Sequence, residues 1–141
     1  MANGFTLIEL LVTLAIISLL IVVATAFVFT AYRDAQANQV AQNFKNLKSA
    51  VESYFVTAHD LPKTRYASST VLSGYISHLP AGYEIAFDTV FNTDNTAAAT
   101  IVYIGGNVKF VDISKNNPEV RQLTVDTYID LPGVEIRIVK W

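Results

Sequence analysis

An apolar run near the N-terminus constrains this chain more than any other feature of its sequence. From Phe5 to Tyr32 the only charged side chain is Glu9, and the run exceeds the ~20 apolar residues that a helix needs to cross a bilayer. Because lipid offers no hydrogen bonds to the main chain, such a segment is expected to be a helix. An ionised side chain at the centre of a spanning helix costs roughly 2.5–3.5 kcal/mol, and less near an end, so Glu9 needs a functional reason.

Glu9 follows Phe5 by about one helical turn, so the two residues share one end and one face of the predicted helix. If Phe5 were the first residue of the chain, its amine would be a cation beside the Glu9 carboxylate. The pair could close within one chain, or between the amine of one copy and Glu9 of a neighbour. The second arrangement would use the charge pair to set the register of an assembly.

The stretch from Gly4 to Leu11 reads Gly-Phe-Thr-Leu-Ile-Glu-Leu-Leu. It resembles the processing site of type IV pilins and of the pseudopilins of type II secretion systems. The resemblance implies that a membrane prepilin peptidase cuts after Gly4, that the new amine of Phe5 is methylated, and that Glu9 guides assembly into a helical filament. No catalytic residue and no cofactor are implied.

The same resemblance implies partners and a location. The partners would be copies of this chain and other pilins, the prepilin peptidase, the inner-membrane assembly platform, and membrane lipid before assembly. The precursor would cross the bacterial cytoplasmic membrane once, and the product would lie in an extracellular pilus or a periplasmic pseudopilus. The role would then be that of a structural subunit and not of an enzyme.

Two features depart from the family pattern. The leader, residues 1–4, carries no Lys or Arg, although family leaders are usually basic, and no proline precedes Pro62. Many major pilins have a proline within the apolar segment, so a minor pilin or minor pseudopilin fits better. Two other classes stay open: a secretory signal peptide cut near Ala24-Thr25-Ala26, and a signal-anchored surface receptor or adhesin that does not polymerise.

The pattern beyond the apolar run predicts an α+β fold. The side chains of Val40, Phe44, Leu47, Val51 and Tyr54 recur in steps of three and four, which predicts an amphipathic continuation of the helix whose stripe packs on a sheet. We expect a leader (1–4), a transmembrane or filament-core helix (5–32), its amphipathic continuation (33–57), an exposed αβ-loop (58–82) with a short helix near 71–78, and an antiparallel β head (83–141).

Alternating apolar residues predict four to five strands in the head. Tyr83, Ile85 and Phe87 share one strand face, and residues 101–113 suggest a hairpin around Gly105-Gly106-Asn107. The polar stretch 93–100 is expected to be a loop. Residues 123–131 and 134–138 are expected to form a second hairpin, with the chain reversing at Pro132-Gly133. Because the chain has no cysteine, strand pairing must hold its end, and Trp141 is expected to cover an edge.

Other chemistries find little support in the sequence. His59 and Asp60 are adjacent, and no nucleophile accompanies them or His78. Four aspartates are possible calcium ligands, but they lack the dense spacing of a calcium loop, so no metal site is predicted. They are Asp88, Asp94, Asp112 and Asp130. The net charge of −2 argues against a nucleic-acid-binding head, apart from a small basic patch of Lys63, Arg65 and Tyr66.

Overall fold

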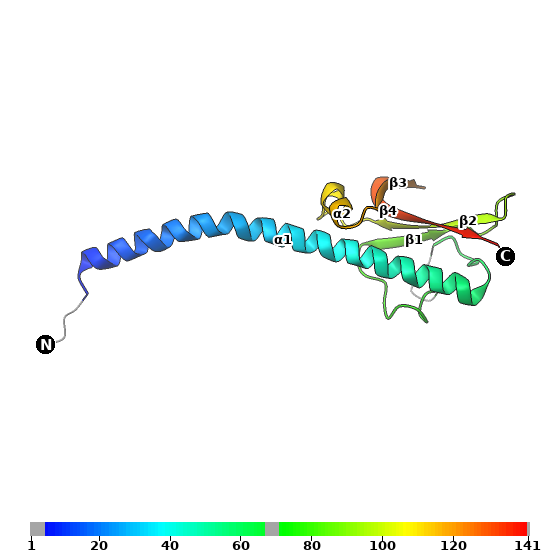
Figure 1. Ribbon diagram of the computed structural model, residues 1–141, viewed down its shortest axis with the longest axis horizontal. Coiled ribbons are helices and arrows are strands. Elements are labelled where there is room, and N and C mark those ends of the chain that lie inside the picture. The colour runs from blue at the N-terminus through cyan, green and yellow to red at the C-terminus, as the bar shows by residue number, and fades with distance from the viewer. Residues whose placement is uncertain (1–4, 67–70, 141) are drawn as a thin grey trace. The chain divides into compact units, whose positions relative to one another are not determined.

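The computed structural model describes residues 5–66 and 71–140 (Figure 1). In chain order its elements are α1 (Leu7–Ala58), β1 (Tyr83–Phe87), β2 (Thr96–Tyr103), α2 (Phe110–Asn116), β3 (Arg121–Val125) and β4 (Tyr128–Val139). The chain divides into two compact units, residues 1–35 and residues 36–141, and each is described by itself. The predicted α+β fold, with a long N-terminal helix and a small antiparallel sheet, is confirmed.

In the described part of the first unit, residues 5–35, the beginning of α1 forms an apolar helix that buries no side chain. Every large apolar side chain from Phe5 to Tyr32 is more than half exposed. The hydroxyls of this segment donate to carbonyls one turn back, at 2.7–3.1 Å. Because lipid offers no hydrogen bonds, these hydroxyl donors must be satisfied within the helix, and here they are. The segment therefore presents an apolar surface to its surroundings. These hydroxyls belong to Thr13, Ser18, Thr25 and Thr30.

In the second unit, the remainder of α1 packs on one face of the sheet (Figure 1). The predicted apolar stripe is buried at four positions, but Tyr54 is only half-buried and the neighbouring Phe55 enters the core in its place. Phe44 is fully buried and meets Tyr83 edge to face, with ring centroids 5.3 Å apart. The Tyr83 hydroxyl donates to the Val40 carbonyl at 3.0 Å. The aromatic contact and this hydrogen bond fix the helix against β1.

All strand pairs are antiparallel, and the strand order is β1-β2-β4-β3. The expectation of a loop over residues 93–100 is wrong, because β2 begins at Thr96. Asp94 starts this strand by accepting the Thr96 main-chain N–H at 3.1 Å and its hydroxyl at 2.6 Å. Ala97 and Ala99 are buried against the helix side of the sheet. Their small side chains fit there but give little hydrophobic signal in the sequence.

The expected hairpin over residues 101–113 is also wrong. After β2 the chain turns and forms the short helix α2, and Ile113 of this helix is fully buried. A short apolar run fits a strand or a helix equally well by periodicity, and here the contact of Ile113 with the core decides for the helix. The short helix expected near residues 71–78 is a turn at 71–75, closed by bonds from the Tyr75 and Ile76 N–H groups to the Leu72 carbonyl.

The final hairpin reverses at Asp126-Thr127 and not at Pro132-Gly133. Asp126 adopts a positive φ of 49°, which an aspartate tolerates in a tight turn. Strand β4 continues through Pro132 and Gly133. The pairing of β4 with β2 ends at Gly133, so the missing N–H of Pro132 interrupts no bond to β2.

The β3-β4 hairpin folds back over the sheet face opposite α1. Val125 is buried against Ala86 of β1 and Val102 of β2, although β3 and β1 stand at opposite ends of the strand order. At the tip of the hairpin, Asp126 accepts two bonds from the Arg65 guanidinium at 2.9 Å and a further bond from the Tyr66 hydroxyl. These contacts hold the hairpin across the sheet.

Candidate processing and assembly segment

The helix begins with a capping box formed by Thr6 and Glu9. The Thr6 main-chain N–H and hydroxyl donate to Oε2 of Glu9 at 2.9 and 2.7 Å, and the Glu9 N–H lies 3.3 Å from the Thr6 hydroxyl oxygen. Such reciprocal bonds satisfy main-chain donors that the first turn leaves unpaired. The negative side chain also lies at the positive end of the helix dipole. Glu9 therefore has a local structural role.

This box engages only half of the Glu9 carboxylate. Both bonds from Thr6 end on Oε2, and within the described residues Oε1 accepts no hydrogen bond. The side chain is held in one position while one oxygen stays available to a donor from another chain. The sequence already contained the signal for this arrangement, a threonine followed three residues later by a glutamate, but the reading of the sequence missed it.

Phe5 and Glu9 lie on the same side of the helix start. They line one shallow hollow together with Ile8, Val12 and Thr13, and the Phe5 side chain is 86% exposed. The predicted charge pair between a Phe5 amine and Glu9 requires a free N-terminus and stays a prediction. Gly4, the residue before the predicted cut, lies outside the described residues, as do Trp141 and the other leader residues.

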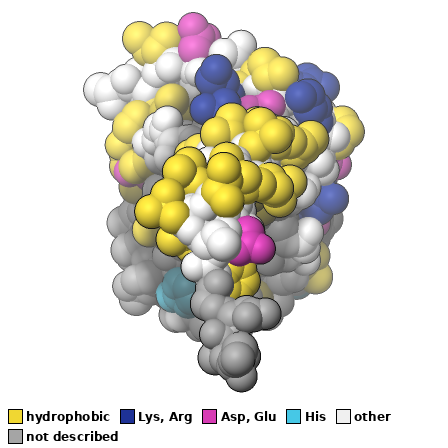
Figure 2. All heavy atoms as spheres, turned by 90° about the vertical axis from the view of Figure 1, so that its left-hand side faces the viewer, with side chains coloured by type: hydrophobic (Ala, Val, Ile, Leu, Met, Phe, Trp, Pro, Cys, Tyr) yellow, Lys and Arg dark blue, Asp and Glu magenta, His cyan; other side chains and the backbone are white. Residues whose placement is uncertain are grey.

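The surface around this segment is apolar. Figure 2 shows hydrophobic side chains gathered over the end of α1 that faces the viewer. A contiguous apolar surface of this extent needs lipid or other chains to cover it. By length and composition, α1 is the one helix among residues 5–66 and 71–140 that could cross a membrane.

The other polar residues singled out from the sequence have separate structural roles. Asp88 accepts the Ala98 N–H at 2.8 Å, Asp94 starts β2, and Asp112 pairs with Lys115 at 3.5 Å. Within the described part of the chain, no group of three or more His, Cys, Asp or Glu side chains could hold a metal ion.

The small basic patch that could contact nucleic acid is partly neutralised. Arg65 and Tyr66 are bound to Asp126, and the paired guanidinium holds the pKa of Asp126 below its ordinary value. The patch therefore offers less free positive charge than the sequence suggested.

The start of the chain matches one family model. Residues 1–25 carry the prokaryotic N-terminal methylation motif. This motif is the class III signal of type IV pilins and pseudopilins, and it supports a type IV pilin-like precursor anchored in the membrane by its apolar helix. No curated protein and no solved structure matches the chain.

Proposed function

We propose that this protein is a structural subunit of a type IV filament, made as a membrane precursor, cut after Gly4 and methylated on the new amine of Phe5. The observation that carries the proposal is the methylation motif over residues 1–25, together with the exposed apolar segment from Phe5 to Tyr32, whose one charged side chain is that of Glu9. A filament core buries such a helix against its neighbours. The second unit then supplies the outer surface.

In this mechanism Glu9 acts at the moment of docking. The Thr6 bonds hold its carboxylate at the helix start, and Oε1 accepts the N-terminal amine of a neighbouring subunit. A charge pair in an apolar core is favourable only when both partners are present and well oriented. A subunit in the wrong register would bury an unpaired charge, so the pair selects one axial position for each newcomer.

The cleavage step is tested by sequencing the mature N-terminus. Cleavage after Gly4 gives a chain that begins at Phe5, an ordinary signal peptidase gives a chain that begins at Phe27, and an uncleaved anchor keeps Met1. Replacing Gly4 by leucine should block processing and leave the precursor in the membrane. A mature chain that still begins at Phe5 after this exchange would disprove the assigned cut.

The assembly step is tested by Glu9→Leu and Glu9→Gln, with Thr6→Val as the matched control. Loss of one partner of a buried charge pair costs about 3–5 kcal/mol, whereas loss of a cap costs about 1 kcal/mol. Both Glu9 variants should insert into the membrane but enter sheared filaments far less than Thr6→Val. Equal incorporation of all three variants and the native chain would contradict the charge-pair mechanism.

The position of this subunit within the filament system is a finer proposal. The apolar segment without proline favours a minor pilin or a minor pseudopilin over a major pilin. A non-polymerising anchored receptor would also associate with membranes, but it would not appear in shear-released fibres, and its deletion would not impair secretion through a pseudopilus. Quantifying the chain in purified fibres relative to the major subunit distinguishes these roles.

A further inference from the structure

Among residues 5–66 and 71–140, one side of β4 has no partner strand over half of the strand's length. β4 runs from Tyr128 to Val139, but its pairing with β3 ends at Gly133. From Val134 onward β4 pairs only with β2, on its other side. Within the described residues, nothing pairs with the β3 side of β4 over 134–139.

The direction of the main-chain groups along this edge follows from the neighbouring strands. Ala98 of β2 directs both of its main-chain groups toward Asp88, because its carbonyl accepts the Asp88 N–H at 2.9 Å and its N–H donates to the Asp88 carboxylate at 2.8 Å. In an antiparallel pair these groups alternate between the two sides of a strand. Ala97 and Ala99 therefore bond to β4, through Ile138 and Ile136.

The residues of β4 that alternate with Ile136 and Ile138 direct their main-chain N–H and C=O groups away from β2. Glu135, Arg137 and Val139 point their N–H and C=O groups toward the open side, and within the described residues these groups form no hydrogen bond. Their side chains are exposed. An exposed row of unpaired groups at regular spacing is a template on which an extended segment can add a strand.

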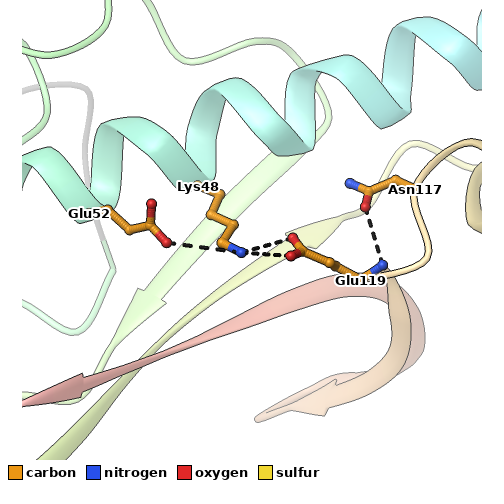
Figure 3. A network of polar contacts seen from close by, with 4 residues as sticks. All are labelled: Lys48, Glu52, Asn117 and Glu119. Carbon is orange, nitrogen blue, oxygen red and sulfur yellow. Dashed lines mark hydrogen bonds and ion pairs between the residues drawn. The ribbon is translucent and has the colours of Figure 1, made fainter.

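A groove accompanies this edge, bounded by the helix on one side and β3 on the other. Its walls come from α1, from the segment before β3, and from both final strands. Figure 3 shows the wall on the helix side, where the Lys48 ammonium lies 2.9 Å from both carboxylate oxygens of Glu119 and 4.0 Å from Glu52. Glu119 is held in turn by its N–H, which donates to the buried Asn117 side chain at 3.2 Å. The lining residues are Lys48, Glu119, Arg121, Leu123, Val134, Glu135 and Arg137.

Two arginines beside the edge have no ion-pair partner among the described residues. The Glu119 carboxylate is engaged by Lys48, whereas Arg121 and Arg137 form no ion pair within the part of the chain that the structure describes, although the charge of Arg137 contributes to the lowered pKa of Asp94. Glu135 is the remaining acid of the groove. A strand added here would place one side chain directly opposite Arg137 and another opposite Glu135. Charge complementarity therefore favours an acidic residue opposite Arg137 and a neutral polar residue opposite Glu135.

We propose that the open edge of β4, residues 135–139, is a docking site for an extended acidic segment of another protein, which adds a strand to the sheet. The main-chain groups of Glu135, Arg137 and Val139 supply the pairing, and Arg137, supported by Arg121, selects the acidic side chain. The site lies wholly in the second unit and is independent of processing and filament assembly.

The test uses the full chain in detergent micelles and two labelled peptides. Each has seven residues of alternating valine and threonine, with aspartate at the centre of one and lysine at the centre of its twin. We expect the aspartate peptide to bind about tenfold more tightly than its twin, because an attractive cross-strand charge pair replaces a repulsive one. Arg137→Glu should reverse this preference, and Lys109→Glu, the same charge change at an exposed residue outside the groove, should leave it unchanged.

Amide hydrogen exchange locates the bound peptide. Binding at this edge should slow exchange at Glu135, Arg137 and Val139, with little change at Ile136 and Ile138, whose amides already bond to β2. Equal binding of the two peptides, or protection elsewhere, would overturn the proposal. Protection of the same amides on raising the protein concentration without peptide would show that a second copy occupies the edge, which would also overturn it.

Discussion

Gly133→Ala tests the close packing at the point where β4 passes from its pairing with β3 to its pairing with β2. A methyl group added at Gly133 would lie 2.7 Å from the Ile101 carbonyl oxygen, 2.9 Å from Cδ1 of Leu123 and 3.2 Å from Cγ1 of Val102. The first of these atoms belongs to the main chain of the central strand β2, which cannot move aside without disturbing its ladder. The residue is a glycine because there is no room for a side chain.

The magnitude follows from two opposing effects. Overpacking of this kind destabilises the fold by about 1–3 kcal/mol. Alanine also lowers the conformational entropy of the unfolded chain, which stabilises the fold by about 0.4–1 kcal/mol. The net destabilisation should be about 1–2 kcal/mol, which lowers the melting temperature of a domain of this size by roughly 5–15 °C. Gly106→Ala is the matched control, since an added methyl group there meets no atom within 4 Å.

The assay is urea unfolding of the full chain in micelles, followed by the near-ultraviolet circular dichroism of the packed tyrosines. Gly106→Ala should unfold at the native urea concentration or slightly above it, and Gly133→Ala clearly below. If both variants unfold at the native urea midpoint, β2, β3 and β4 do not approach one another this closely in solution, and the hairpin does not pack here as described.

Three further predictions concern the second unit. Phe44→Ala, which removes a fully buried ring, should cost about 3–5 kcal/mol in the same unfolding assay. Lys48→Met should cost less than about 1 kcal/mol, because its ion pair with Glu119 is partly exposed. Bonds from Arg65 and Tyr66 lower the pKa of Asp126, so the stability that they give is present above the unfolded aspartate pKa of about 3.9 and is lost as pH falls through the lower folded value. Asp126→Asn should therefore be less stable than the native chain at pH 7, and unfolding titrations should show the difference shrinking below about pH 4.

The long helix, with its apolar first part and its amphipathic second part, could be predicted because the signals for both parts are local. The apolar run from Phe5 to Tyr32 and the stripe around Phe44 repeat with the period of a helix, and no glycine or proline interrupts them. The partner of the stripe was also predictable in kind, since an apolar helix face needs an apolar sheet face to cover it. The capping box of Thr6 and Glu9 was readable as well, although it was overlooked.

The wrong predictions concern segments where the sequence signal was weak, or where it fitted two structures equally well. The first half of β2 was predicted to be a polar loop, because its alanines contribute little to an apolar pattern. Their small side chains nevertheless suit a tight contact with the helix. Residues 110–116 combine branched and aromatic residues that favour a strand in isolation, yet they form a helix that buries Ile113 in the core. At the final hairpin, Pro132-Gly133 is the stronger turn signal, but the chain turns at Asp126.

The sequence by itself determined that this chain begins with an apolar helix bearing one acid, continues as an amphipathic helix and ends in a small antiparallel sheet. Those features depend on periodicity and composition within short windows. Only the tertiary structure decided where the sheet reverses, which half of β4 lacks a neighbour, and that Arg65 meets Asp126 across 61 positions of sequence. Such contacts depend on which surfaces meet after the chain has folded, and no local window of residues contains that information.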